Sequence, residues 1–313
     1  VITSLSLPPF NYLIINFFTF SSFFIFLVRK LNQQQNKKLF FIYGWLFGFG
    51  YFLSNLYWIS ISLKFDENFK FLIPFTVILI PAFLSLFYGL FSYLFSIFKT
   101  KKIISSFFLF SLIFGILEFV RGSILTGFPW NLIAYSFSNQ LEILSITSII
   151  GTYGFNLFCI SLFTCPAIFI LRDKKKDIGF VIFFLLIVLF FYMHGSLNKK
   201  KFEEAEKKNY EYKLRVIGSN ISIDRFYKDI DTVSIIRELI ELSDPVKNEK
   251  TIFVWPEGIL PEVFHEQLPK YASLFDEKFN ANHLLIIGIN SHNEVNGLKK
   301  YYNSLIIYDH QLN

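Results

Sequence analysis

The sequence predicts a polytopic helical membrane domain followed by an α/β domain outside the cytoplasm. The chain of 313 residues is 53% hydrophobic and 20% aromatic, which is too apolar for a soluble domain of this size. Six apolar stretches of membrane-spanning length precede residue 198. After residue 212, short β-type runs alternate with helical patterns, as in an α/β layer fold. We therefore expect a membrane domain over residues 1–197, a charged linker over 198–211 and an α/β domain over 212–313.

The six predicted spans are long enough for helices, which need about 20 apolar residues to cross the hydrocarbon core. They cover residues 10–28, 39–63, 71–98, 103–120, 143–171 and 178–197. Gly44, Gly48 and Gly50 in the second span predict a close helix-packing face, because small residues let helix backbones approach. Cys159 and Cys165 lie in an apolar stretch and are interpreted as packing residues. We expect neither a disulfide nor a thiolate metal site in the polar third of the chain.

The charge of the connecting segments predicts the orientation of the spans. The first, third and fifth connections are basic, which places them in the cytoplasm, whereas the second and fourth balance opposite charges and belong outside. Everything after residue 197 is then extracytoplasmic. Because the lysines act as topology determinants, the net charge of +6 indicates no nucleic-acid partner. The same orientation places residues 1–9 outside without a span to carry them there. Since the sequence starts at Val1 and stops in mid-pattern at Asn313, we expect incomplete ends.

One pair of opposite charges lies near the outer end of the fourth span. Glu118 and Arg121 are three positions apart, and Thr126-Gly-Phe-Pro-Trp-Asn131 follows at the interface. A carboxylate at membrane depth is costly unless it is paired, so Arg121 is the predicted partner of Glu118. The following loop has two interpretations: an interfacial anchor with Trp130 in the aromatic belt, or a lipid-handling site.

The polar third of the chain predicts one carboxylate at the end of a strand. Strands are expected at 214–217, 251–254, 283–289 and 302–308, with a helix at 232–242, a loop and helix at 260–279, and a turn at Gly297. The second strand leads into Trp255-Pro256-Glu257-Gly258, where α/β folds keep their chemistry. A solvated turn residue is the alternative role of Glu257, since turns favour proline and glycine. No two histidines have metal-ligand spacing, which argues against a zinc hydrolase, and we expect no metal and no cofactor.

Several motifs together resemble the bacterial apolipoprotein N-acyltransferase family. Its membrane half is matched by Glu118-x-x-Arg121, Thr126-Gly-Phe-Pro-Trp130 with Tyr135, and Gly151-Thr-Tyr-Gly154. Its soluble half is matched by Trp255-Pro256-Glu257 and Tyr302-Asn303-Ser304. The resemblance covers nearly the whole chain. It implies a nitrilase-like (carbon–nitrogen hydrolase) αββα sandwich, incomplete at its C-terminus, on the periplasmic side of the bacterial inner membrane.

The same resemblance implies a function. The family transfers an acyl chain from a membrane phospholipid to the N-terminal amine of the diacylglyceryl-cysteine of apolipoproteins, through a cysteine thioester. Glu257 would be the general base of a Glu-Lys-Cys triad. In the family the lysine and cysteine follow the Tyr-Asn-Ser strand, so both are expected beyond residue 313. Lys299 and Lys300 precede that strand and are interpreted as solvated hairpin lysines. The expected partners are the phospholipid donor, the diacylated apolipoprotein acceptor and membrane lipids.

The chain departs from the family at one loop. Asn220-Ile221 matches, but Ser222-Ile223 stands in place of a Pro-Gln pair and Tyr227 in place of a tryptophan, which leaves the role of residues 220–227 open. Two other interpretations remain open. One is a membrane-tethered nitrilase-like amidase that shares Glu257, and the other is a non-catalytic split or decayed fragment. We expect residues 1–313 to lack N-acyltransferase activity on their own, because Glu257 is not expected to reach the cysteines of the fifth span.

The predicted orientation is open to a direct test. A reporter that is active only in the cytoplasm, fused after Tyr212, is expected to be silent, because the charge alternation puts that residue outside. The same reporter fused after Lys101, in a predicted cytoplasmic connection, is the positive control. Activity of the Tyr212 fusion would overturn the arrangement.

Overall fold

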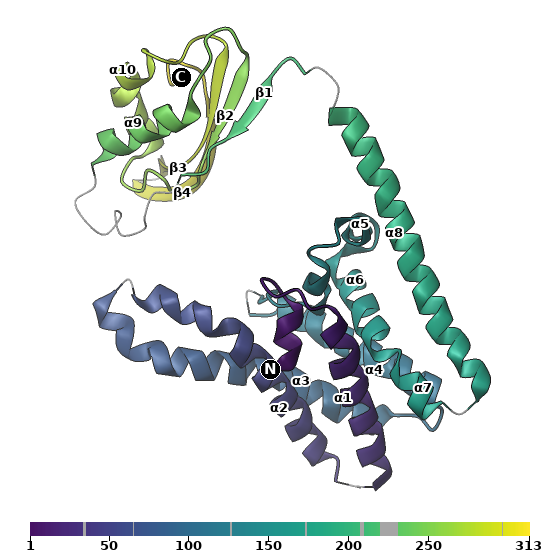
Figure 1. Cartoon of the computed structure of the whole chain (residues 1–313). Helices are drawn as coiled ribbons and strands as arrows, with labels where there is room; N and C mark the ends of the chain where they lie inside the picture. The colour runs from purple at the N-terminus through teal and green to yellow at the C-terminus, as the bar shows by residue number, and fades with distance from the viewer. Residues whose placement is uncertain are drawn as a thin grey trace. The chain divides into compact units, whose positions relative to one another are not determined.

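The computed structural model describes residues 1–313 except 34–35, 65, 126, 173, 207–209, 220–230 and 296. The loop at 220–227 and Thr126 of the interfacial motif therefore lie outside the described residues. The chain divides into two compact units, Val1–Glu206 and Lys207–Asn313, and each is described by itself (Figure 1).

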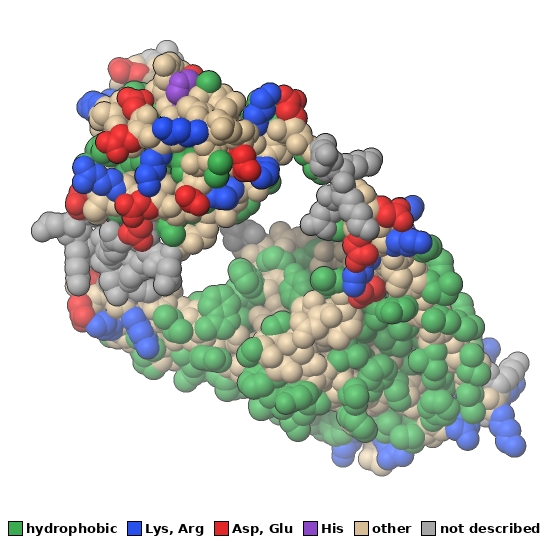
Figure 2. All heavy atoms as spheres, turned by 45° about the horizontal axis from the view of Figure 1, so that its top comes forward, with side chains coloured by type: hydrophobic (Ala, Val, Ile, Leu, Met, Phe, Trp, Pro, Cys, Tyr) green, Lys and Arg blue, Asp and Glu red, His purple; other side chains and the backbone are tan. Residues whose placement is uncertain are grey.

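The first unit is a bundle of α-helices. Their bounds are α1 Ile14–Gln33, α2 Lys38–Leu56, α3 Ile73–Phe98, α4 Ile103–Ser123, α5 Leu141–Leu144, α6 Thr147–Thr164, α7 Ala167–Leu171 and α8 Ile178–Glu206. Short 3-10 segments at Tyr57–Lys64 and Glu67–Leu72 extend α2 and α3. Six helical segments are long and apolar enough to cross a membrane, which confirms the predicted helical membrane architecture. Figure 2 shows hydrophobic side chains over most of the visible surface of this unit.

Two predicted boundaries differ from the structure. The stretch at 143–171 is not one continuous helix, because Gly151 (φ 71°, ψ 166°) interrupts the helical backbone inside α6 and Pro166 separates α6 from α7. At the other boundary, α8 continues to Glu206, so residues 198–206 of the predicted linker are helical. Lysine and glutamate are good helix formers, and a polar helix can extend past the end of its apolar span.

Close packing of α2 on α3 depends on glycine. A Cβ added at Gly44 would overlap the backbone oxygen of Tyr88 and the side chain of Ser92, and one added at Gly48 would lie 2.8 Å from the Tyr88 Cβ. The predicted packing role is therefore confirmed for these two glycines, whereas Gly50 lies near Val1 instead. Cys159 and Cys165 are buried free thiols in the helical core, as predicted.

The second unit is built on a four-stranded mixed sheet in the order β1-β2-β3-β4. The strands are β1 Lys213–Val216, β2 Thr251–Trp255, β3 His283–Val295 and β4 Leu298–Tyr308. β1, β2 and β3 are parallel, whereas β3 and β4 form an antiparallel hairpin. The helices are α9 Thr232–Ser243 and α10 Ala272–Phe275, which follows a 3-10 turn at His265–Tyr271. The predicted alternation of strands and helices is confirmed. The hairpin is longer than predicted, because its turn end is polar and lacks the apolar signal of a buried strand.

The two faces of this sheet have different surroundings. Ile236 and Leu239 of α9 pack with Phe253 and Leu285 in one buried cluster, so the helices cover this face. The opposite face carries apolar side chains that are 58–69% exposed, namely Leu214, Val216, Leu305 and Ile307. Within the described residues this second face has no covering layer, although its composition is that of a buried surface.

The glycine contact between α2 and α3 generates a stability prediction. In an open helix position, replacing glycine by alanine is expected to stabilise by about 0.5–1 kcal/mol. Gly44→Ala is expected to lower the melting temperature of the protein in detergent, because overpacking of about 1–3 kcal/mol outweighs that gain. Gly179→Ala is the matched control, since an added Cβ there meets nothing within 4 Å. Equal melting temperatures for the two variants would contradict the packing role.

Candidate functional site

The strand before Glu257 is held in place by its last residue. The Trp255 side chain is buried, its ring stacks on Phe275 with centroids 5.6 Å apart, and its indole Nε1 donates to Ser243 Oγ of α9 at 2.9 Å. Pro256 follows and cannot continue the ladder, so the chain leaves the sheet at this point. Glu257 is therefore an exposed residue of the turn that follows β2, two positions after the anchored Trp255.

The neighbouring strands are shaped around Glu257. Asn303 of β4 donates from Nδ2 to Glu257 Oε1 at 2.5 Å. Gly288 of β3 leaves room for the glutamate backbone, since a Cβ there would lie 2.9 Å from the Glu257 Cα. Glu257 and Asn303 both belong to motifs that sequence reasoning singled out. Their contact joins strands 46 positions apart in the chain.

Glu257 and Asn303 lie in a pocket of about 270 Å³ with an apolar floor. Its lining is Val254, Trp255, Glu257, Ile286, Gly288, Asn303, Ser304 and Leu305. Neither a lysine nor a cysteine is among these lining residues. Lys299 and Lys300 lie opposite Glu294 and Asn293 in the hairpin, as predicted. This arrangement offers a carboxylate that can accept a proton, but the lining includes neither the lysine nor the cysteine of the expected triad, so the role of Glu257 as a base stays a prediction.

Three histidines of the second unit make contacts within it. His265 Nδ1 lies 2.6 Å from the Tyr308 hydroxyl, and burial raises the pKa of Tyr308 to about 12. His283 Nε2 lies 3.1 Å from the Val246 oxygen. His292 Nδ1 lies 3.2 Å from Glu266 Oε2. The described residues contain no cluster of three His, Cys, Asp or Glu side chains that could hold a metal.

In the first unit, Glu118 and Arg121 form the predicted ion pair. The guanidinium donates from Nε to Oε1 at 3.0 Å and from Nη2 to Oε2 at 2.9 Å. The two side chains are at most 1% exposed. The pairing is bidentate, the geometry that best matches a guanidinium to a carboxylate. The prediction that Arg121 neutralises Glu118 is therefore confirmed.

The third nitrogen of Arg121 holds the interfacial loop. Nη1 donates to the backbone oxygens of Phe128 at 2.6 Å and Trp130 at 3.1 Å. The backbone oxygen of Asn131 accepts from the Tyr51 hydroxyl at 2.8 Å. Asn131 itself has a positive φ of 58°, which asparagine tolerates better than most residues. The loop is thus fixed through its backbone by two side chains from the helical core.

The motif Gly151-Thr-Tyr-Gly154 packs through Tyr153 against α4. The hydroxyl of Tyr153 occupies the position where a Cβ of Gly122 would lie. The Tyr153 ring meets Phe119 edge to face, with centroids 5.2 Å apart. Further along the same helix, α6, Asn156 Oδ1 accepts from the backbone nitrogen of Ala134 at 3.0 Å. The structure therefore brings together the described parts of three motifs that are separate in the sequence.

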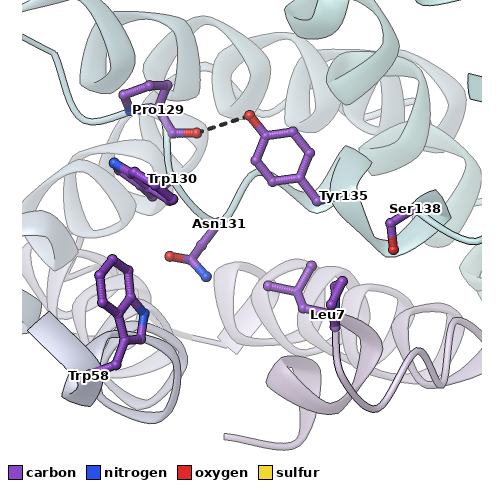
Figure 3. Close-up of a pocket in the computed structure, with 8 residues that line it drawn as sticks. Leu7, Trp58, Pro129, Trp130, Asn131, Tyr135 and Ser138 are labelled. Atoms are coloured by element: carbon purple, nitrogen blue, oxygen red, sulfur yellow. Dashed lines mark hydrogen bonds between the residues drawn. The ribbon is translucent and has the colours of Figure 1, made fainter. Parts of the chain in front are cut away.

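A pocket of about 640 Å³ opens beside this loop (Figure 3). It is lined by Leu7, Pro8, Trp58, Pro129, Trp130, Asn131, Tyr135 and Ser138, a largely apolar set. Trp58 and Trp130 meet at an angle of 64° with centroids 5.6 Å apart, and the Tyr135 hydroxyl donates to the Pro129 oxygen at 3.4 Å. Partial burial raises the pKa of Tyr135, so its hydroxyl remains a donor at neutral pH. Sequence reasoning missed Trp58, which lies outside the motif and is brought to this pocket by the fold.

Asn131 is the polar centre of this pocket. Figure 3 shows its amide between Trp58 and Leu7. Its Oδ1 is buried and has no hydrogen-bond partner among the described residues. A largely apolar pocket whose lining includes a few polar residues, namely Asn131, Tyr135 and Ser138, suits an amphipathic ligand, because the apolar part of the ligand can line the walls while its polar group meets polar side chains.

Comparisons with known proteins place these motifs in a family. Residues 1–165 match the family model described as the apolipoprotein N-acyltransferase N-terminal domain. The chain is 27% identical over 321 residues to an apolipoprotein N-acyltransferase of Allorhizobium ampelinum, which covers 98% of this chain and 59% of that protein. The corresponding protein of Brucella melitensis is 27% identical over 274 residues, covering 85% and 51%. That of Rhodopseudomonas palustris is 25% identical over 326 residues, covering 99% and 60%. The chain thus spans little more than half the length of these relatives.

The buried ion pair generates a stability prediction. Glu118→Gln is expected to destabilise the helical unit by about 3–5 kcal/mol, because it leaves Arg121 buried without its counter-charge. Replacing both residues by leucine is expected to cost less than this single change, since no unpaired charge remains. Glu67→Gln is the control, because that carboxylate is 84% exposed. Thermal melting in detergent measures all three, and a Glu118→Gln protein as stable as the control would contradict the account.

Proposed function

Because this chain belongs to the apolipoprotein N-acyltransferase family, we propose that the protein containing it moves an acyl chain from a membrane phospholipid to the N-terminal amine of a diacylated apolipoprotein. Family membership rests on the match over residues 1–165, which is more than half of the chain. The relatives are named for this activity. The donor, the acceptor, the inner-membrane location and a periplasmic active site are part of the proposal.

The proposed chemistry has two covalent steps. A cysteine thiol, expected outside residues 1–313, loses its proton to Glu257 and attacks the ester carbonyl of the phospholipid. The carbon–oxygen bond breaks, the lysophospholipid alkoxide takes up a proton, and an acyl-thioester remains. The lipoprotein amine then attacks the thioester, an amide forms, the amine loses a proton and the cysteine is released. A lysine, also expected outside these residues, stabilises the oxyanion of both steps.

The observation that carries the role of Glu257 is its contact with Asn303. A carboxylate is a more effective general base when it is held in position, and the Asn303 amide donates to one oxygen of Glu257. The pocket lies on the open face of the sheet, where the Glu257 and Asn303 side chains are exposed, and Val254, Ile286 and Leu305 are among its lining residues. An exposed turn residue is the alternative role of Glu257, and the hydrogen bond from Asn303 is the observation that favours the base.

The open face of the sheet supports a larger fold than the described one. Leu214, Val216, Leu305 and Ile307 form an exposed apolar surface on a sheet whose other face is covered. We infer that further layers complete a nitrilase-like αββα sandwich over this surface, because exposed apolar faces of this kind are normally buried.

The pocket of the helical unit favours a lipid substrate over a small amide. A membrane-tethered amidase, the alternative function, would also use Glu257 but would not need a pocket at the membrane interface. The pocket beside Trp130 is apolar, about 640 Å³ in volume and lined by two tryptophans. These are the properties of a site for an acyl chain and its ester at the membrane interface.

One substitution tests the catalytic proposal. In the protein that contains this chain, Glu257→Gln is expected to leave membrane insertion intact and to lower acyl-thioester formation by roughly two to four orders of magnitude, since the amide cannot take the proton. Glu262→Gln makes the same chemical change at an exposed position outside the pocket and is the control. A phospholipid with a labelled acyl chain reports the intermediate. If the acyl-thioester of Glu257→Gln is labelled as strongly as that of the unchanged protein, Glu257 is not the base and is only a turn residue.

A further inference from the structure

A groove separate from the two pockets described above lies at the C-terminal end of α1. It has a volume of about 440 Å³ and runs between the last three turns of α1 and the short helix α7. Its lining is Ser22, Ile25, Phe26, Arg29, Lys30 and Gln33 from α1, with Ile170 from α7. No step of the proposed acyl transfer uses this groove.

The lining changes in polarity along the groove. Ile25, Phe26 and Ile170 make an apolar section, and Arg29 and Lys30 follow one helical turn later. At about 1.5 Å per residue, the distance along the helix from Ser22 to Arg29 is about 10 Å, which is enough for the first carbons of an acyl chain below a headgroup. The groove is therefore amphipathic in the same sense as a phospholipid.

The positive charge at this end of α1 comes from more than one segment. No ion pair to Arg29 or Lys30 is present within the described residues. Lys99, just after α3, donates from Nζ to Asn32 Oδ1 at 3.1 Å and adds a third cation at this end of α1. The positive-inside rule places this end in the cytoplasmic leaflet. Figure 2 shows basic side chains gathered at the lower end of the unit.

We propose that this groove is a binding site for one anionic phospholipid of the cytoplasmic leaflet. The phosphate binds Arg29 and Lys30, and one acyl chain lies along Ile25, Phe26 and Ile170. Arginine suits the phosphate because its planar fork can bind two oxygens at once. Basic pockets between helices on the cytoplasmic side commonly bind the headgroups of anionic lipids. Charge complementarity commits the site to a lipid such as phosphatidylglycerol, and excludes zwitterionic phosphatidylcholine as a comparable ligand.

Native mass spectrometry of the whole chain in detergent tests this site with added phosphatidylglycerol or phosphatidylcholine. We expect one phosphatidylglycerol per chain in addition to any lipid held by the pocket beside Trp130, and at least tenfold weaker retention of phosphatidylcholine as this additional lipid. Arg29→Gln with Lys30→Gln is expected to abolish this preference. Lys101→Gln with Lys102→Gln makes the same charge change outside the groove and is expected to keep it. Equal losses in both double variants would show a general charge effect and overturn the proposal.

A second variant separates the groove from its charge. Ile170 is 63% exposed, so Ile170→Trp is expected to fold while filling the apolar section with all cations in place. It is expected to lower phosphatidylglycerol retention at least tenfold, whereas Ile182→Trp, at a 56% exposed position of α8, is not. Full retention in Ile170→Trp, or displacement of the lipid by soluble glycerol phosphate, would contradict a lipid seated in the groove.

Discussion

The ion pair between Glu118 and Arg121 is the interaction on which the loop that carries Trp130 depends. Two charges inside a membrane protein are tolerated only when each hydrogen-bonding position has a partner. Two nitrogens of Arg121 bind the carboxylate, and the third binds the oxygens of Phe128 and Trp130. The electrostatic requirement of the pair therefore fixes the path of the loop. That path positions Trp130 and Asn131 beside a lipid-sized pocket.

The α/β unit positions its carboxylate by a different means. Here the strand ladder sets the register, so that Asn303 of β4 meets Glu257 after β2 with β3 between them. Trp255 anchors the strand end in the core beneath the site. Each unit thus holds one part of the proposed reaction on rigid backbone: the interfacial pocket for the lipid in the first, and the base in the second.

Much of this arrangement could be predicted from the sequence, because its signals are local. The apolar spans, the pairing of Glu118 with Arg121 at i and i+3, and the strand before Glu257 all depend on residues close in the chain. The break of the fifth span at Gly151 could not be predicted, since apolar content does not report backbone angles. The Glu257–Asn303 bond and the contribution of Trp58 to the pocket depend on long-range packing, which no short motif encodes.

We propose that the loop held by Arg121 builds a site for a phospholipid. The most direct measurement is photocrosslinking of the protein with a phospholipid that carries a diazirine near the ester end of one acyl chain, followed by mass spectrometry of the labelled peptides. We expect adducts concentrated on residues 128–138 and on Trp58, and we expect unlabelled phospholipid to compete with their formation. Adducts spread over lipid-facing positions such as Leu185 and Leu189 of α8 in proportion to their exposure, without enrichment at the loop, would contradict it.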